Sequence, residues 1–550
     1  MLFILFFISF LNTAYSENIH IIHADLIQKN DHNDAIFLIG NIHFEYQKYH
    51  LFCDKAIYYK KNNRLYGYGN VQLKSKENKI ISKKIYIEDN FSHFKLSGGV
   101  ILFIGKIKLT ADTINCNLKK KLFQAVNHVV FIFNKFRLTT NMLEYDFNKK
   151  KVFYIDSIIY YDDYIIHSKE GFFSLYEEKA ELKNGIKLIS KNYTVHANAL
   201  EYFFKQKKIN FNRSVLIVQN DKSDNFIYAQ KALFFIQKKI FLLEKYVSIH
   251  CNEKIVKGKH LFFNQKKKYG FIRNFLLEDL KKKYFLIGGY GKFNFHNDSL
   301  ILKENPKIVK TSKENSFIID SDILKINLRK NSTYSIQAFS VKSFFLNESI
   351  QGKCNILNYE SSNDYIKFSG NPIFWFQNHQ ITGESIDVSF LEKNEYSLKS
   401  IKIIKKASYI EKINSKEFNQ VEGDMITGFF NEENTLEKIL IQGNVKSIIF
   451  IDDKKEKKLM NKSSCGVLSL YLDKEKKITK IYCVEQVYSE LIPLSEEPPN
   501  EFLFLSDKIW KEKPKICKNF FVYKEIEKYR KENYLEQEEI KTIKNRTKFL

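Results

Sequence analysis

The chain of 550 residues has few of the residues that mark irregular or membrane-spanning proteins. Only 6 prolines and 20 glycines are present, which argues against a collagen-like or proline-rich disordered chain. No stretch reaches about 18 consecutive apolar residues, so we expect no transmembrane helix. The 7 cysteines are scattered without a Cys-x-x-Cys pair. Their spacing predicts no metal site, and their odd number leaves at least one without a disulfide partner in the chain. Most are expected to be buried as small apolar side chains.

Sequence motifs of catalysis are also missing. Neither Gly-x-Ser-x-Gly nor His-Glu-x-x-His occurs. Gly289-Tyr290-Gly291 begins like a dinucleotide-binding loop, but Asn294 stands where the third glycine belongs, and no helical pattern follows. We therefore expect no enzymatic activity and no cofactor.

Two groups of polar residues could still be considered as sites. Asp54 and Asp112 recur at similar places in the chain, which would allow a catalytic pair, but turn hydrogen bonds explain such a recurrence better. His20 and His23 lie close together near the N-terminus and could form a metal pair. Two histidines without further ligands are a weak signal, and we expect no metal.

The residues that are abundant favour a large β-structure. Hydrophobic residues make up 44% of the chain, and its 49 phenylalanines and 32 tyrosines suit half-buried strands. The formal net charge of +25 has two explanations. It either attracts an anionic partner, such as nucleic acid, phospholipid or the phosphates of lipid A, or it reflects A/T-rich codons that encode much lysine. We favour the codon explanation, because much of the charge lies in solvated turns.

The N-terminus has the pattern of a secretory signal peptide. An apolar run covers residues 2–11, and Ala14-Tyr15-Ser16 places small residues three and one positions before a cleavage site. The run is too short to cross a bilayer as a helix. We expect residues 1–16 to be removed, with Glu17 as the first residue of the mature chain.

An internal repeat is the main feature of the sequence. Apolar residues that follow Gly-Asn or a similar pair recur every 29 residues, and then at steps of 28, 29 and 32, at Ile42, Val71, Val100, Val129, Ile158, Ile186, Val215 and Val247. A second apolar series keeps step with the first, at Ile57, Ile85, Ile114, Leu143, Phe172, Leu200, Leu233 and Leu261. Repeats of this length bury their apolar faces by stacking on their neighbours.

Within each repeat, apolar and polar residues alternate, which predicts strands with one buried face. Polar breaks such as 60–63 and 148–151 indicate turns, so each repeat holds two long strands or three shorter ones. The fold class is therefore an all-β, elongated repeat array. The predicted inward-facing residues, which are also our candidates for the lining of an apolar groove, are Ile42, Phe44, Val71, Leu73, Val100, Leu102, Val129 and Phe131.

The repeat also suggests a division of the chain. Residues 17–275 form the regular N-terminal β-repeat domain, and residues 276–500 form a second, more divergent β domain. Residues 501–550 lie beyond the last recognisable repeat and are rich in Glu and Lys, which predicts a charged tail or an exposed helix.

The paired elements resemble the OstA/LptA organic-solvent-tolerance family. In residues 21–263, a Gly-Asn-Val element alternates with an Ala-Asp-x-Ile/Leu element. The later segments 370–375, 380–384, 422–430 and 442–445, and the stretch 504–514 around Trp510, resemble the long OstA-like proteins of Bacteroidetes-type bacteria. The sequence departs from the pattern at Asn127-His128-Val129 and Asp156-Ser157-Ile158, where we expect different turns.

The resemblance implies a twisted β-jellyroll, open along one side, and a non-enzymatic periplasmic conduit or chaperone for lipopolysaccharide in outer-membrane assembly. Its implied partners are lipopolysaccharide or lipid A, other envelope transport components, and further copies joined end to end by strand pairing, but no nucleic acid. The implied location is the periplasm, including an association with the outer membrane. Two alternatives remain: a structural or adhesive β-solenoid without lipid, and a polysaccharide-processing enzyme on a β-helix.

The first testable prediction concerns export. Cleavage after Ser16 should give a mature chain that starts at Glu17, because the apolar run and the small residues before the site match signal peptidase recognition. N-terminal sequencing of the exported protein checks this. Exported protein that still begins at Met1 would contradict the assignment.

Overall fold

The computed structural model describes residues 19–493 with short gaps, together with residues 505, 510–513, 536–543 and 545. The gaps are 31–33, 47–48, 77, 89–91, 118, 134–135, 162, 175–176, 282, 311–316, 330–332, 347–349, 364, 392–393, 434, 453–457 and 474–477. The predicted signal peptide lies outside the described residues. Within them, no helix is long and apolar enough to cross a membrane.

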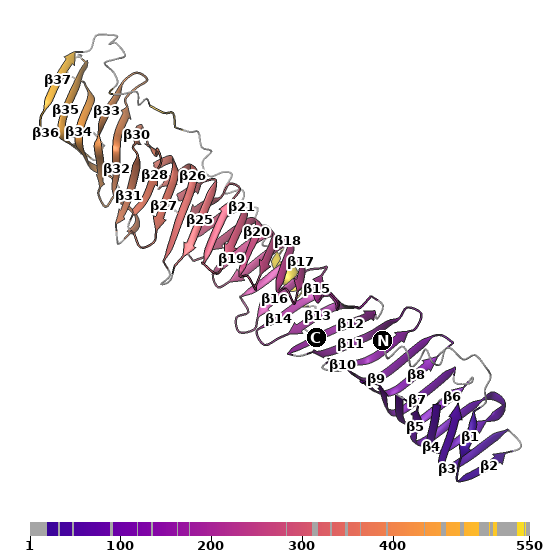
Figure 1. Cartoon of the computed structure of the whole chain (residues 1–550). Helices are drawn as coiled ribbons and strands as arrows, with labels where there is room; N and C mark the ends of the chain where they lie inside the picture. The colour runs from indigo at the N-terminus through magenta and orange to yellow at the C-terminus, as the bar shows by residue number, and fades with distance from the viewer. Residues whose placement is uncertain are drawn as a thin grey trace. The chain divides into compact units, whose positions relative to one another are not determined.

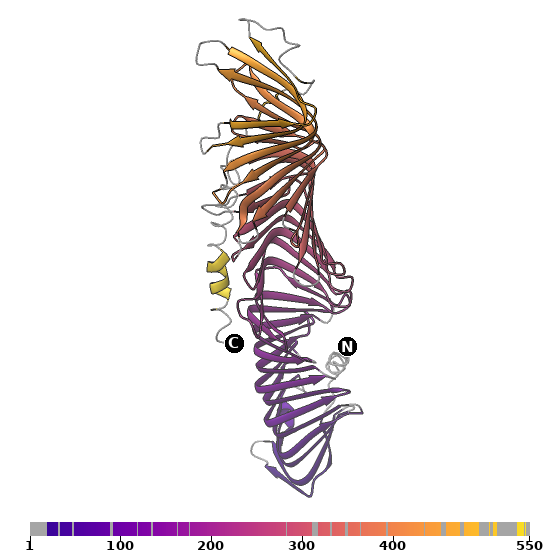
Figure 2. The same ribbon diagram turned by 90° about the vertical axis from the view of Figure 1, so that its left-hand side faces the viewer.

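The chain divides into two compact units, which are treated separately below. Unit 1 comprises residues 1–249 and 529–550, and unit 2 comprises residues 250–528. In both units, successive strands lie side by side, as Figures 1 and 2 show. The sequence boundary near residue 275 stays a prediction.

The described residues form 37 strands. The strands of the first part are β1 (His20–His23), β2 (Leu26–Asn30), β3 (Ala35–Tyr46), β4 (Tyr49–Tyr59), β5 (Arg64–Lys74), β6 (Asn78–Glu88), β7 (His93–Ile104), β8 (Ile107–Asn117), β9 (Leu122–Phe133), β10 (Phe136–Asp146), β11 (Lys151–Tyr161), β12 (Tyr164–Ser174), β13 (Lys179–Ile189), β14 (Tyr193–Phe203), β15 (Lys208–Phe211), β16 (Val215–Gln219), β17 (Phe226–Phe235) and β18 (Ile240–Cys251).

The remaining strands are β19 (Lys254–Asn264), β20 (Tyr269–Asp279), β21 (Tyr284–Asn294), β22 (Ser299–Lys303), β23 (Lys307–Lys310), β24 (Phe317–Asp320), β25 (Ile323–Leu328), β26 (Tyr334–Leu346), β27 (Ile350–Glu360), β28 (Tyr365–Ser369), β29 (Ile373–Phe376), β30 (His379–Thr382), β31 (Ser385–Leu391), β32 (Asn394–Lys412), β33 (Phe418–Phe430), β34 (Leu436–Asp452), β35 (Lys458–Leu472), β36 (Ile478–Val484) and β37 (Tyr488–Pro493). A single 3-10 turn, η1 (Lys60–Asn62), connects β4 to β5.

From β3 to β14, each strand pairs antiparallel with the strands before and after it. Most are 11 or 12 residues long, so one 29-residue repeat is two long strands and two turns. The prediction of an all-β repeat array with the β-jellyroll arrangement is confirmed. In unit 2, several strands split into two short ones, as at β22–β23 and β28–β29. Pro306 and Pro372 lie at these two breaks, where proline cannot donate a ladder hydrogen bond.

Alternate long strands of unit 1, from β3 to β13, bend near the middle at one or two left-handed residues, a place that we call the corner. In β5 the corner is Gly69-Asn70, where both residues have positive φ angles of 73° and 42°. The pairing of β4 with β5 shifts register there, between Phe52 and Lys55. A bulge with left-handed residues changes the direction of the strand, so the two halves of one strand enter two different layers.

A carboxylate braces several corners from the preceding strand. Asn70 donates a hydrogen bond from Nδ2 to Oδ2 of Asp54, at 2.9 Å. The same contact joins Asn444 to Asp424, also at 2.9 Å. Asp54 therefore holds a turn, as the sequence interpretation of the repeated acids expected, and the Gly-Asn and Ala-Asp elements of the repeat are the two sides of one corner.

The two layers bury their apolar faces against each other. The ring of Phe44, which follows the corner of β3, lies 6.2 Å from that of Tyr58 in the other layer. In unit 2, Phe344 and Phe374 of one layer pack on Phe368 of the other at 4.6 and 4.8 Å. These cross-layer contacts form the core of the jellyroll.

The C-terminal residues of unit 1 cover part of its outer surface. Ile540 and Ile543, in the helical residues 536–543, pack on Leu216 and Tyr228. In Figure 1 the yellow helix lies beside β17. Leu216 follows the inward-facing Val215, and successive residues of a strand point to opposite faces. The helix therefore lies against the outer face of the sheet, whereas the sequence predicted only a charged tail or an exposed helix.

In unit 2, Leu505 and Lys511 contact an outer face in the same way. Trp375 is 1% exposed and donates from Nε1 to the carbonyl oxygen of Lys511 at 2.8 Å. The backbone N–H groups of Lys511 and Leu505 donate to the side-chain oxygens of Gln380 and Gln420, at 2.8 and 3.2 Å. The burial of Trp375 thus comes from Lys511 as well as from the sheet.

The cysteines behave largely as small apolar residues. Cys53, Cys116 and Cys354 are buried and unpaired, and Cys251 is exposed. Cys465 and Cys483 form a disulfide between β35 and β36. Cys517 lies outside the described residues.

The corner generates a stability prediction. Gly69→Ala should lower the free energy of unfolding by about 2–4 kcal/mol, because alanine is strained at this φ and its Cβ would overlap the Asp54 carboxylate. Gly99→Ala is the matched control: Gly99 has a φ of 77° but open space around its Cβ position, so the backbone strain of about 1 kcal/mol acts alone. Urea denaturation of both variants measures the difference. Equal losses of unfolding free energy in the two variants would show that the contact with Asp54 does not determine the conformation of the corner.

Candidate functional site

The candidate site is the inward face of the N-terminal part of unit 1. Seven of the eight residues predicted to face inward are 0–3% exposed: Ile42, Phe44, Val71, Leu73, Val100, Leu102 and Val129. The eighth, Phe131, is only half-buried. The inward phase of the repeat is thus confirmed for seven of these positions, while their contact with lipid stays a prediction.

One position of the repeat itself follows a different phase. Val129 is buried in β9, but at the equivalent place in β11 Ile158 is half-buried, and Ser157 and Ile159 are the buried residues, at 2% and 5% exposure. The corner of β11 contains one left-handed residue, Asp156, where β9 has two. A shift of one residue moves every following side chain to the other face, which fits the expectation of a different turn at residues 156–158. The Ser157 and Ser168 hydroxyls hydrogen-bond inside, at 2.9 Å.

Strand register assembles the inward residues into a continuous row, which we call the inner row. Each member is the direct cross-strand partner of the next, from β3 to β10: Phe44, Leu51, Leu73, Ile80, Leu102, Leu109, Phe131 and Leu138. Direct partners on one face have Cβ atoms about 5 Å apart. The row is therefore an unbroken apolar strip across eight strands.

A second strip lies on the other layer and is called the facing row. Its members are also successive cross-strand partners: Tyr58, Leu65, Ile87, Phe94, Cys116, Phe123 and Tyr145. All are 0–2% exposed. Phe44 of the inner row and Tyr58 of the facing row are in aromatic contact, so the two rows shield each other from water.

The ionisable groups of this interior are held neutral. Burial raises the pKa of Tyr58 and of Tyr145. It also raises the pKa of the Cys116 thiol, and that of Cys53 to about 12. At neutral pH these groups carry no charge, and the space between the rows suits hydrocarbon rather than acid–base chemistry.

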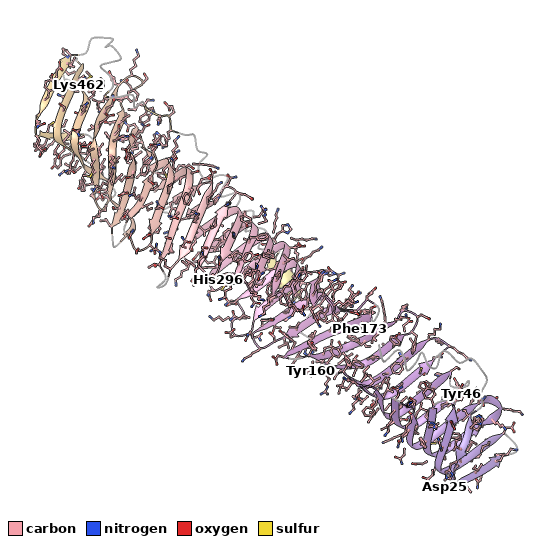
Figure 3. All side chains as sticks on the ribbon, in the orientation of Figure 1. Asp25, Tyr46, Tyr160, Phe173, His296 and Lys462 are labelled. Carbon is pink, nitrogen blue, oxygen red and sulfur yellow. A yellow bond between two sulfur atoms is a disulfide. The ribbon has the colours of Figure 1, made fainter. Side chains whose placement is uncertain are left out.

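The hairpins at the two ends of the strands differ in character. The turns after β4, β8 and β10 carry the exposed lysines Lys60, Lys61, Lys119, Lys120, Lys121, Lys149 and Lys150. The turns on the opposite side, after β7, β9, β11 and β13, are flanked by the aromatic residues Phe103, Phe133, Tyr160, Tyr161, Tyr164 and Tyr193, which are 37–46% exposed. Figure 3 shows Tyr160 and Phe173, near opposite ends of the β11–β12 pair, toward different margins.

The sequence interpretation missed this second, aromatic margin. We call the two margins the lysine rim and the aromatic rim. The lysine clusters were noted as solvated turns, but the turns between them were not compared with one another. The recurrence of Phe or Tyr beside alternate turns is the signal that could have identified the aromatic rim.

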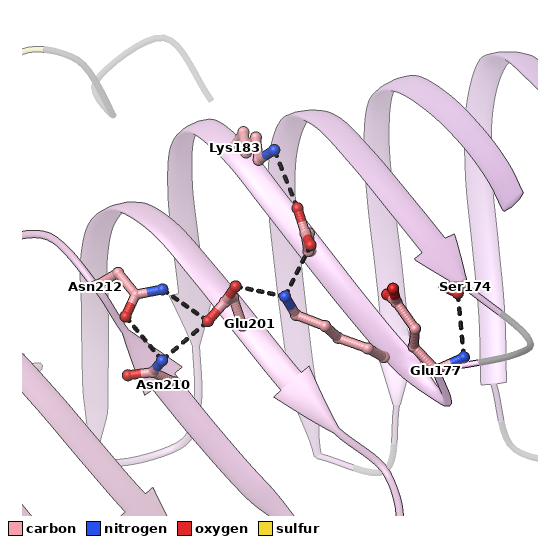
Figure 4. Close-up of polar contacts among 8 residues, drawn as sticks. Ser174, Glu177, Lys183, Glu201, Asn210 and Asn212 are labelled. Atoms are coloured by element: carbon pink, nitrogen blue, oxygen red, sulfur yellow. Dashed lines mark hydrogen bonds and ion pairs between the residues drawn. The ribbon is translucent and has the colours of Figure 1, made fainter.

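The outer face carries the charged network of Figure 4. Lys179 binds Glu181 at 2.8 Å and Glu201 at 2.5 Å. Asn210 and Asn212 each donate to the other oxygen of Glu201, at 2.9 and 2.6 Å. These side chains alternate with inward residues such as Leu182 and therefore point outward.

The electrostatics of this network keep both carboxylates charged. The hydrogen bond from Lys179 lowers the pKa of Glu181 against the opposing effect of burial. Burial acts to raise the pKa of Glu201, but Lys179, Asn212 and Asn210 outweigh it and the pKa is lowered. A general acid needs a raised pKa, so this pair does not have the properties of a polysaccharide-cleaving site.

The two acids noted in the repeat are also not a catalytic pair. Asp54 accepts from Asn70, and Asp112 binds His128 Nδ1 at 2.8 Å. They belong to the separate corners of β4–β5 and β8–β9, with the β6–β7 corner between them. Among the described residues, no group of three or more His, Cys, Asp or Glu side chains is arranged to hold a metal ion.

Comparison with known proteins identifies one part of the chain. Residues 16–123 match the family model of the OstA-like protein. A solved structure that matches is LptH of Pseudomonas aeruginosa, the LptA-homologous periplasmic component of a lipopolysaccharide transport device. It is 11% identical, covers 24% of this chain and 77% of its own, and superposes with a TM-score of 0.15. No curated protein matches the sequence.

The charged network gives a prediction with a defined pH dependence. Lys179→Met should lower the free energy of unfolding by about 1–2 kcal/mol at pH 7, because it removes two partly buried, charge-assisted contacts. The pKa values of Glu181 and Glu201 are lowered in the folded protein. Their contribution to the free energy of unfolding is therefore fully present above their unfolded pKa, near 4.5. It is lost as the pH falls through their folded pKa values.

Denaturation by urea at pH 7 and at pH 3 tests this dependence. The deficit of Lys179→Met should shrink at pH 3. Lys205→Met is the control, because Lys205 pairs with Glu178 at 3.6 Å but is 82% exposed, where such pairs contribute little. A deficit that is the same at both pH values would mean that packing, not charge, explains the effect of Lys179.

Proposed function

We propose that this chain, whose residues 16–123 are OstA-like, is a non-enzymatic periplasmic lipopolysaccharide-transport conduit or chaperone in outer-membrane assembly. The observation that carries the proposal is the coincidence of two features. The segment that matches the family model, residues 16–123, contains most of the inner and facing rows, which form an uncharged interior.

The chemistry of the ligand fits this interior. Each methylene group of an acyl chain that leaves water gains about 0.8 kcal/mol, so hydrocarbon that enters between the rows is strongly favoured once they separate. The rows now bury each other at 0–3% exposure, apart from Phe131. Acyl chains must therefore separate the two layers. Apolar contacts between lipid and side chains then replace the apolar contacts between the layers.

The two rims suit the polar end of such a lipid. Phosphates attract lysine ammonium groups, and the lysine rim provides clusters such as Lys119–Lys121 along one margin. Tyrosine and phenylalanine side chains can lie at the boundary between hydrocarbon and water, which fits the aromatic rim. We therefore orient lipid A with its phosphates toward the lysine rim.

The outermost strands supply docking edges for further partners. In the described residues, β1 and β2 pair only with β3, and Ile22 and Ile27 there are 51% and 54% exposed. In unit 2, β36 and β37 pair only with β35. Strand edges of this kind accept another chain by main-chain hydrogen bonds. The partners we propose are other envelope transport components or a second copy joined end to end.

Two observations support a periplasmic location. The N-terminal residues have the signal-peptide pattern, and the Cys465–Cys483 disulfide requires an oxidising compartment. A location at the outer membrane would follow from the transport role.

A structural or adhesive β-solenoid without a lipid ligand is the second candidate. The observation that favours it is the tight mutual burial of the inner and facing rows, since a purely structural array needs a sealed core. The two candidates differ in whether lipid reaches the inner row.

A photo-crosslinking residue at position 73 distinguishes them. Leu73 lies in the inner row, and Gln72 is its neighbour on the opposite face of β5. We expect a crosslinker in place of Leu73 to capture lipopolysaccharide in cells, and the same group in place of Gln72 to capture none, because only position 73 faces the lipid path. Capture is measured as a lipopolysaccharide-positive band of higher mass.

The controls for this experiment separate misfolding from lack of binding. Each variant must retain the unfolding transition of the wild-type protein, since bulk added to a packed core destabilises by about 1–3 kcal/mol. Equal capture at positions 72 and 73 would indicate nonspecific contact. No capture at position 73, together with no lipopolysaccharide in the purified wild-type protein, would favour the structural β-solenoid.

A further inference from the structure

Two histidines meet on the outer face of the first hairpin. His43 of β3 and His50 of β4 approach with 3.1 Å between Nε2 of the first and Nδ1 of the second. Both alternate along their strands with buried residues, among them Phe44 and Leu51. The pair is thus on the opposite side of the sheet from the inner row.

Strand register brings further metal-binding residue types to the same face. Glu45 is the cross-strand partner of both His50 on β4 and His20 on β1. His23 of β1 is the register partner of His43. The sequence noted His20 and His23 as an isolated pair, whereas the fold places them beside a second pair and a carboxylate.

The orientation of the His43 ring is fixed by packing on the outer face of the sheet. The His43 ring stacks on Phe52, with centroids 4.5 Å apart, which restricts its orientation. Such fixed rings lose little entropy when a ligand binds.

The distance between Nε2 of His43 and Nδ1 of His50 also fits a metal ion. Metal–nitrogen bonds of about 2.0–2.1 Å at a tetrahedral ion place two ligand nitrogens roughly 3.4 Å apart. The observed 3.1 Å needs to widen by only a few tenths of an ångström. Glu45 adds negative charge beside the pair, while Lys74, 5.0 Å from the Phe52 ring centroid, is the nearby cation that opposes it.

We propose that His43 and His50 form a two-histidine site for a divalent transition-metal ion of the Zn²⁺, Ni²⁺ or Cu²⁺ class. Among the described residues no group of three His, Cys, Asp or Glu side chains is arranged to hold a metal ion, so the two imidazoles are the protein ligands and water completes the coordination. The site lies beside β1, on the outer face and next to an edge strand. It is separate from the proposed lipid path and does not depend on it.

Titration of the untagged, full mature chain with Ni²⁺, followed by isothermal calorimetry at pH 7.5, tests the site. We expect one equivalent to bind, and His43→Gln and His50→Gln each to weaken binding at least tenfold, since loss of one histidine leaves a single imidazole ligand. Glu45→Gln should weaken it less. His167→Gln is the control, because His167 is an outward-facing histidine whose charged neighbour is Lys187.

Circular dichroism must show that the His43 and His50 variants remain folded, and their unfolding midpoints report any structural loss separately. Absence of Ni²⁺ binding by the wild-type chain would overturn the proposal. Binding by folded His43→Gln and His50→Gln with wild-type affinity would do the same, because the ion would then occupy another site. Neither outcome bears on lipopolysaccharide capture at position 73.

Discussion

The structure depends on a left-handed bend in alternate long strands, a conformation that backbone sterics make costly for most residues. Gly69-Asn70 and its equivalents adopt left-handed conformations, and carboxylates such as Asp54 satisfy the neighbouring amide. Once a strand bends, its halves join two layers, and each layer needs only one apolar face. The repeat of two strands and two turns follows from this bend, and so does the position of every inward side chain after it.

The separation of the two faces explains where chemistry is possible. In the inner and facing rows, groups such as Tyr58 and Cys116 are kept neutral by burial, so this part of the interior can receive hydrocarbon. Outside, charged residues such as Lys179 and Glu201 neutralise one another at hydrogen-bond distance. Charged side chains can therefore act on the outer face, the rims and the strand edges, while the lipid path we propose lies in the interior.

Much of the fold was predictable because the spacing of apolar residues encodes the bend. Seven of the inward positions, Val100 and Val129 among them, follow directly from the 29-residue step. A different turn was expected at residues 156–158, but the phase of Ile158 could not be predicted, because the number of left-handed residues at a corner varies and Asp156 alone does not reveal that number. The contact of His43 with His50 required strand register as well as sequence. The outer-face position of the helix around Ile540 required knowledge of a tertiary contact that no local pattern encodes.

The covering of outer faces by the C-terminal residues sets an order of events during biogenesis. The chain leaves the ribosome from its N-terminus, so Leu216, Tyr228 and Trp375 emerge well before the residues that shield them. Until the last segment arrives, apolar outer patches face water and are open to wrong associations. A protein of this design would depend on holding factors during its synthesis, and a chain cut short near residue 500 would expose these patches permanently.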